Sequence, residues 1–152
     1  MIILDTTVLA YAVGKEHPLR EPCRRLLAAH ASGAIEATTT VEVLQQFAYV
    51  RARRRSREDA VNLTRLYVVA LGPIVTTTAE LDAGLTLFGQ HPELGAFDAV
   101  LAAVALSRGA EALVSAVRAF ASVPELAWID PATSAIDRLV GDSASGAGET
   151  DR

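Results

Sequence analysis

The sequence predicts an α/β domain built around a mostly parallel sheet that helices cover on both faces. Short strand-like stretches alternate with helical stretches along the chain, an arrangement typical of parallel strands joined by helical crossovers. Apolar residues make up 51% of the 152 residues but aromatic residues only 5%, so we expect a core of small aliphatic side chains. This length corresponds to one ordinary domain.

The first third of the chain contains five predicted elements. Residues 1–5 begin with a continuous apolar run without a helical period, which indicates a short buried strand. Two threonines can then cap a short helix over 6–13, and a second helix over 19–32 ends at a glycine. Residues 35–39 are β-branched and rich in threonine, as in a strand, and the apolar stripe of 41–54 predicts a third helix.

The middle of the chain contains three predicted helices and one predicted strand. Residues 58–71 form a helix that a Gly-Pro pair ends, and the β-branched residues 74–78 follow as a strand. Two further helices cover 79–90 and 97–107, with a His-Pro pair and a glycine between them. The second of these is apolar nearly all round, which indicates deep burial.

The last part of the chain contains two short predicted strands, at residues 112–115 and 127–129. From residue 133 onward Gly, Ser, Ala and acidic residues accumulate, which predicts partial disorder. We therefore expect a single domain over 1–132 and a partly disordered C-terminal extension over 133–152.

Composition limits the kind of protein that this is. Cys23 is the only cysteine, so an intrachain disulfide and a cysteine-rich zinc site are excluded. No apolar run reaches the roughly 20 residues that a membrane span needs, and the N-terminus lacks the pattern of a secretory signal. We expect a cytoplasmic protein that does not bind membranes.

Three carboxylates stand alone in apolar stretches. Asp5 ends the first predicted strand, whereas Glu42 and Asp98 lie in the first turns of predicted helices, and none has a basic residue within three positions. Each has an ordinary explanation as a helix cap or a first-turn acid. Buried carboxylates are costly without compensating charge, however, and parallel sheets form sites at the carboxyl ends of their strands. If the fold brings the three together, oxygen ligands favour Mg²⁺ or Mn²⁺.

Arginine accounts for 13 of the 14 basic residues, and five arginines lie between positions 51 and 57. The net charge of −4 does not indicate a nucleic-acid-binding protein, but this local excess could contact phosphates. The alternative is a solvated helix end, where cations are favoured by the helix dipole. The cluster comprises Arg51, Arg53, Arg54, Arg55 and Arg57.

Four stretches, in this order, resemble the PIN-domain family and, within it, VapC-type toxins of bacterial toxin–antitoxin systems. They lie at residues 3–9, 40–47, 95–103 and 112–120, and the resemblance extends to about residue 131. It implies a three-layer α/β/α sandwich around a short, mostly parallel sheet and a Mg²⁺-dependent ribonuclease. It also implies that Asp5, Glu42 and Asp98 are catalytic metal-binding acids, assisted by the hydroxyl groups of Thr7 and Ser115.

Val117 departs from the family pattern, because the family usually has a further acid at that position and valine offers no ligand atom. This copy is either a naturally weakened or inactive enzyme, or an enzyme in which the valine was introduced to make a toxic protein tolerable to produce. The resemblance further implies an RNA substrate, a homodimer and a cognate antitoxin, with the arginine cluster as a candidate contact for RNA or antitoxin. The alternative function is that of a non-catalytic PIN-fold protein that binds RNA or an antitoxin.

Overall fold

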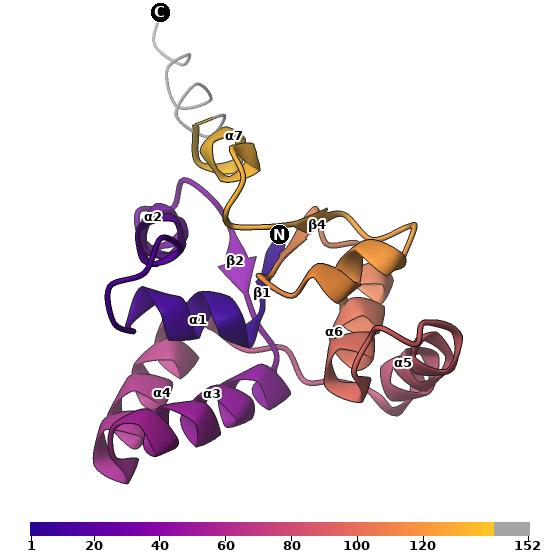
Figure 1. Cartoon of the computed structure of the whole chain (residues 1–152), viewed down its shortest axis with the longest axis horizontal. Helices are drawn as coiled ribbons and strands as arrows, with labels where there is room; N and C mark the ends of the chain where they lie inside the picture. Colours follow the sequence, from indigo (N-terminus) through magenta and orange to yellow (C-terminus); the bar gives the residue numbers. More distant parts are fainter. Residues whose placement is uncertain (142–152) are drawn as a thin grey trace, which may run out of the picture.

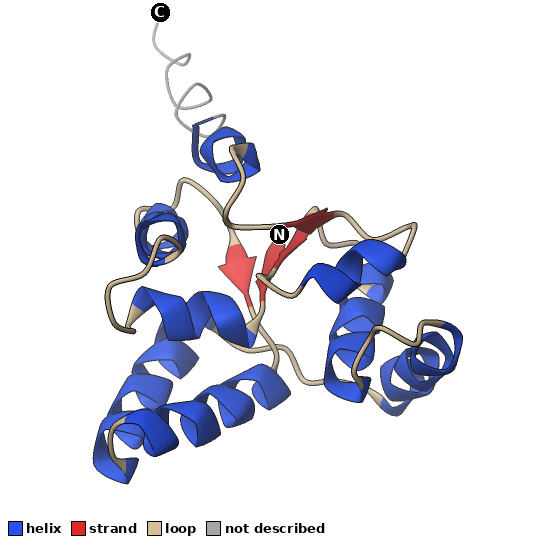
Figure 2. Ribbon diagram, viewed as in Figure 1, coloured by secondary structure: helices blue, strands red, loops and turns tan. Residues whose placement is uncertain are grey.

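The computed structural model describes residues 1–141 and shows a four-stranded sheet surrounded by helices (Figure 1, Figure 2). The strands lie in the order β2-β1-β3-β4, and all three strand pairs are parallel. The α/β class with a short parallel sheet is therefore confirmed. The strands are β1 (Ile2–Leu4), β2 (Ala37–Thr38), β3 (Ala112–Val114) and β4 (Trp128–Ile129).

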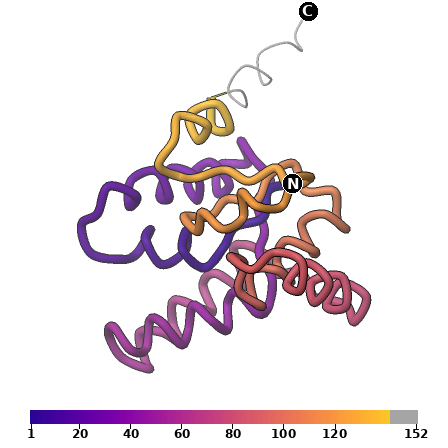
Figure 3. The backbone as a smooth tube through the Cα atoms, turned by 45° about the vertical axis from the view of Figure 1, so that its right-hand side comes forward, coloured from indigo at the N-terminus to yellow at the C-terminus, as the bar shows by residue number. Residues whose placement is uncertain are grey.

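Two helix pairs are the largest features outside the sheet. Helix α3 packs against α4, and α5 packs against α6, and the two pairs extend from the sheet in different directions (Figure 3). Helix α1 contacts both α2 and α3. The helices are α1 (Thr6–Ala12), α2 (Arg20–Ala31), α3 (Val41–Arg54), α4 (Arg57–Leu71), α5 (Thr78–Gln90), α6 (Ala96–Ser107), the 3₁₀ helix η1 (Arg118–Ser122) and α7 (Ala135–Gly141).

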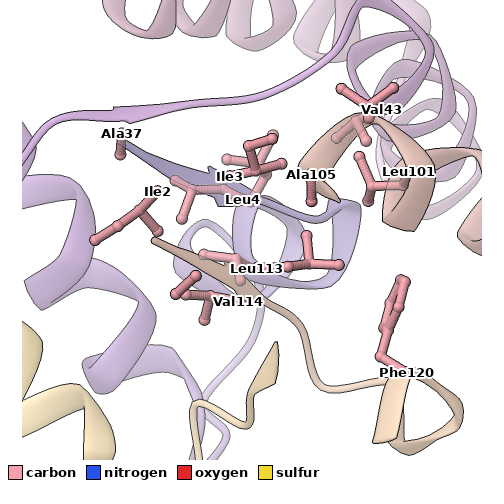
Figure 4. Close-up of a cluster of buried hydrophobic side chains, with 14 of the residues drawn as sticks. Ile2, Ile3, Leu4, Ala37, Val43, Leu101, Ala105, Leu113, Val114 and Phe120 are labelled. Carbon is pink, nitrogen blue, oxygen red and sulfur yellow. The ribbon is translucent and has the colours of Figure 1, made fainter. Parts of the chain in front are cut away.

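The core consists mainly of aliphatic side chains, as the composition predicted. Every residue of β1 and β3 is buried, and the helices contribute residues such as Val43 from α3 and Leu101 from α6 (Figure 4). Phe120 on η1 is fully buried against the same cluster. A sheet that is buried on both faces explains why its strands read as apolar runs without alternation.

The carboxyl ends of β1, β2 and β3 lie at the same end of the sheet. Leu4 pairs with Val114, and the N–H of Asp5 donates to the carbonyl of Val114 at 3.1 Å. The residues that follow β1 and β3, Asp5 and Ser115, are consequently neighbours. Thr39 follows β2 and donates its hydroxyl to the Leu4 carbonyl at 2.7 Å, so the third strand end is tied to the same place.

The predicted strand over residues 74–78 does not form, and this prediction was wrong. Only one parallel bridge is present there, between Thr40 and Ile74. Pro73 has no N–H to donate to a ladder, and Thr77 is already the N-cap of α5 in a capping box with Glu80. The segment is therefore an ordered connection between α4 and α5, and α5 begins at Thr78.

Two helical segments near the C-terminus were not predicted. The 3₁₀ helix η1 follows Val117, and α7 lies within the extension that was expected to be partly disordered. Helix α7 packs on α2 through Ile136, which is 1% exposed, and Asp137 accepts a hydrogen bond from Arg25 at 2.7 Å. Residues 142–152, where disorder was also predicted, lie outside the described part of the chain. Across residues 1–141, no helix has both the length and the apolar character that crossing a bilayer would require.

Candidate active site

Asp5 is 3% exposed and caps α1 at the carboxyl end of β1. Three donors converge on its Oδ2 atom: the Ser115 hydroxyl at 2.7 Å, the Thr7 hydroxyl at 2.9 Å and the Thr7 N–H at 3.4 Å. Within residues 1–141 the other oxygen, Oδ1, accepts no hydrogen bond. The ordinary explanation of Asp5 as a helix cap is thus correct, but capping occupies only one of its two oxygens.

The hydroxyls of Thr7 and Ser115 also join the ends of β1 and β3. Thr7 Oγ1 accepts from the N–H of Ala116 at 3.0 Å, and Ser115 Oγ accepts from the N–H of Val117 at 3.0 Å. The Trp128 indole donates to the Ser115 carbonyl at 2.9 Å. The structure therefore brings Thr7 and Ser115 to Asp5, where the resemblance placed them, and fixes each hydroxyl by more than one bond.

Glu42 lies in the first turn of α3, which Thr40 caps through the N–H of Val43. Glu42 is not part of a capping box with an upstream threonine, because the residue three positions after the cap is Val43. Its Oε2 atom instead accepts a hydrogen bond from the Thr76 hydroxyl at 2.9 Å. Sequence reasoning missed Thr76, since it lies in the segment that was expected to be a strand.

Asp98 lies half-buried in the first turn of α6. Burial, with a further contribution from the negative charge of Asp5, raises the pKa of this carboxyl to about 6. The effect of Asp5 shows that the two acids are close enough to repel each other. None of the four ion pairs in the described residues involves Asp5, Glu42 or Asp98, and Asp98 accepts no hydrogen bond there.

All three acids line one pocket with a volume of about 360 Å³. The pocket lies between the α3–α4 pair and the α5–α6 pair, with Gln46 and the connection to α5 completing its polar part. Its remaining wall is apolar, and Leu85 and Phe97 are each about half exposed there. The pocket thus has two chemically different parts, an acidic one that attracts cations and an apolar one that can bury flat or apolar groups.

The oxygen atoms that line the pocket are of the kind that bind a hard divalent cation, but they do not form a complete set of ligands around one point. The candidate side-chain ligand atoms are carboxylate, hydroxyl and amide oxygens, and a cation would relieve the repulsion between Asp5 and Asp98. As the side chains stand, however, no group of three or more His, Cys, Asp or Glu residues in 1–141 is arranged to hold a metal ion. The three acids thus line one pocket, as predicted, whereas metal binding stays a prediction.

Val117 lies directly beside this network, half-buried against the core. Its N–H donates to Ser115, whose hydroxyl in turn donates to Asp5. The backbone therefore places position 117 next to Ser115, which contacts Asp5, although the Val117 side chain offers no ligand atom.

The arginine cluster separates into two kinds of residue. Arg51 is largely buried: its Nε donates to Asp59 on α4, and its Nη1 donates to the Val13 carbonyl at 3.0 Å. The others are exposed. Arg53 contacts the ring and hydroxyl of Tyr49, and the charge of Arg55 acts on Asp59. Arg51 is thus a structural residue, and Arg53, Arg54, Arg55 and Arg57 are the members that remain available to a partner.

Comparison with known proteins gives consistent matches. The PIN-domain family model matches residues 2–126. The chain is 52% identical over 146 residues to Ribonuclease VapC7 of Mycobacterium tuberculosis, covering 93% of this chain and 99% of the relative. It is 37% identical over 112 residues to Ribonuclease VapC23 of the same species, covering 72% and 86%. A crystal structure of VapBC2 from Rickettsia felis, bound to a DNA fragment from their promoter, is similar to this chain with a TM-score of 0.67 and 18% identity. The alignment covers 86% of this chain and 98% of the chain in that structure, and the similarity concerns the fold alone.

Proposed function

The chain belongs to the PIN-domain family and to its VapC group, and we propose that it is the ribonuclease toxin of a toxin–antitoxin module that cleaves RNA in a metal-dependent reaction. The observation that carries this proposal is the shared pocket of Asp5, Glu42 and Asp98 at the carboxyl edge of the sheet. The 52% identity over nearly the whole chain to a protein named as a ribonuclease supports the same activity.

We propose Asp5, Glu42 and Asp98 as the residues that hold Mg²⁺ or Mn²⁺. When bound, such a cation supplies positive charge against the scissile phosphate and activates water for hydrolysis. Thr7 and Ser115 orient Asp5 by donating to Oδ2, which leaves Oδ1 without a hydrogen bond in the described residues. The apolar wall near Phe97 offers a surface against which a nucleotide base can pack.

The proposed partners are RNA, a cognate antitoxin that covers the acidic pocket, and a second copy of the chain in a homodimer. Arg53 and Arg54 end α3, the helix that also carries Glu42, and Arg55 and Arg57 follow at its C-cap and at the start of α4. All four are exposed. This placement supports their proposed role in contacting RNA phosphates or the antitoxin.

The second candidate function is that of a non-catalytic PIN-fold protein, and Val117 is the observation that favours it. A missing acid beside Ser115 lowers the negative charge that attracts a cation to the pocket. We expect it to weaken metal binding and slow the reaction more than it disturbs the fold.

A ribonuclease assay with four proteins tests the proposal: the wild type, Asp5→Asn, Asp98→Asn and Val117→Asp. We expect Mg²⁺-dependent cleavage by the wild type, loss of cleavage with EDTA or with either asparagine variant, and faster cleavage with Val117→Asp. Asparagine is chosen at position 5 because its side-chain oxygen can still cap α1. Calorimetric titration with Mg²⁺ should show tighter binding by Val117→Asp.

The outcomes separate the two functions. If neither the wild type nor Val117→Asp cleaves RNA, while the wild type binds RNA, the protein is a binding module. If cleavage persists in EDTA and in Asp98→Asn, the activity does not come from this pocket.

A further inference from the structure

The connection between α4 and α5, residues 72–77, is held rigidly beside the acidic pocket. The N–H of Ile74 donates to the Thr39 carbonyl at 2.8 Å, and the N–H of Val41 donates to the Ile74 carbonyl at 3.1 Å. These two bonds attach the connection to the chain between β2 and α3. The start of α3, which carries Glu42, therefore cannot move independently of this connection.

The residues on both sides of Thr76 are fixed as well. The Val75 carbonyl accepts from Arg108 Nη2 at 3.2 Å, and the Thr77 N–H donates to Glu80 Oε2 at 2.8 Å. Glu80 is buried and also accepts from Arg108 Nε at 2.6 Å, so one ion pair secures both neighbours. The backbone of Thr76 is thereby held in one place relative to α3, α5 and the end of α6.

We propose that Thr76 is a positioning residue that orients Glu42 for its role in the pocket. Its hydroxyl donates to Glu42 Oε2 at 2.9 Å, and Oε1 accepts no hydrogen bond within residues 1–141. A long glutamate side chain has several rotamers in a half-open pocket, and one bond from a rigid donor selects among them. The inference rests on the proposed function, because it assigns Glu42 to cation binding.

Asp5 provides an internal parallel for this arrangement. All its hydrogen-bond donors meet on one oxygen, which leaves the second oxygen free, and Thr76 leaves Glu42 in the same condition. Both acids are therefore presented as single-oxygen ligands whose other oxygen is held by a hydroxyl group. Groups that orient ligands in this way affect metal affinity without touching the metal.

Thr76→Val and Thr76→Ser test the proposal, with Thr86→Val as the matched control. Valine keeps the shape of threonine but cannot donate, whereas serine can. Thr86 also lies on this part of the chain, but its hydroxyl donates only to the Asp82 carbonyl within α5. Calorimetry with Mn²⁺ and the ¹³C chemical shift of the Glu42 carboxyl carbon, recorded without metal, are the two measurements.

We expect Thr76→Val to lower Mn²⁺ affinity by about 10–100-fold, the range typical of lost ligand-orienting hydrogen bonds. Thr76→Ser should restore affinity to within a few-fold, and Thr86→Val should not change it. The Glu42 carboxyl shift should move in Thr76→Val alone. In a Glu42→Gln background, Thr76→Val should have no further effect on affinity.

Unchanged or tighter Mn²⁺ binding by Thr76→Val would overturn the inference while leaving the proposed function intact. If the wild type itself binds no Mn²⁺, the proposed metal-dependent function fails, and the metal-free carboxyl shift alone decides whether Thr76 orients Glu42. An unmoved shift in Thr76→Val then refutes the positioning role.

Discussion

Asp98→Asn should stabilise the metal-free protein at neutral pH, although it removes an acid from the proposed active site. Asp98 is half-buried, accepts no hydrogen bond in residues 1–141 and is repelled by Asp5. Both effects disfavour the charged carboxylate, and they raise its pKa from 3.8 to about 6. Asparagine has nearly the same shape but carries no charge, so neither effect opposes it.

The size of the effect follows from the two pKa values. A raised pKa in the folded protein means that the folded state binds more protons than the unfolded state, so this group lowers stability as pH rises. At about 1.36 kcal/mol per pKa unit, the penalty is near zero well below pH 3.8, about 1 kcal/mol at pH 4.5 and about 3 kcal/mol above pH 7. The difference in the free energy of unfolding between Asp98→Asn and the wild type should therefore increase by about 2 kcal/mol between pH 4.5 and pH 7.5.

Urea unfolding in EDTA between pH 4.5 and 7.5 measures this difference, and comparing the two proteins cancels the titration of groups that do not interact with Asp98. Adding Mg²⁺ at pH 7.5 should stabilise the wild type and leave Asp98→Asn unchanged, because binding to the folded state adds stability only where the site exists. A difference that stays constant within about 0.5 kcal/mol across the pH range would refute the reasoning.

Two further predictions concern packing and the arginine cluster. Gly84→Ala should destabilise the protein by about 1–3 kcal/mol, because the new Cβ would lie 2.6 Å from Val100 Cα. In the same helix, a Cβ added at Gly89 would meet nothing within 4 Å, so Gly89→Ala should stabilise the protein by about 0.5–1 kcal/mol. Thermal unfolding distinguishes the two variants, and equal effects would contradict the close contact at Gly84. Arg51→Ala should lower the free energy of unfolding by about 1–3 kcal/mol, because it removes two partly buried hydrogen bonds. Joint replacement of Arg53, Arg54 and Arg55 should leave stability unchanged, weaken RNA binding and flatten its dependence on salt. A salt dependence identical to that of the wild type would assign these three to surface solvation.

The sequence predicted the sheet and most helices because their signals are local. The apolar runs of β1 and β3, and the alternation of strands with helices, require only burial on both faces of a sheet. The three acids were also found locally, since each stands alone in an apolar stretch. Their placement at one pocket follows from a general property of parallel sheets, whose strand ends face one edge.

The parts that were missed depend on contacts between distant residues. The segment at 74–78 has the composition of a strand, but Thr77 and Glu80 form a capping box that starts α5 instead. Helix α7 has a weak local signal and is ordered by Ile136, which packs into the core, and by the Arg25–Asp137 pair. The bond from Thr76 to Glu42 spans 34 positions, so no local pattern could reveal it.

The electrostatics of the pocket also bear on Val117. Adding an acid there places one more negative charge near Asp5, which should raise affinity for a cation and, without the cation, lower stability. Valine has the opposite effect, and its side chain contributes apolar contact with the core. A protein with Val117 should therefore be more stable without metal and gain less from Mg²⁺ than Val117→Asp does. If both proteins gain equally from Mg²⁺, position 117 does not act on the cation, and the departure from the family pattern has no bearing on activity.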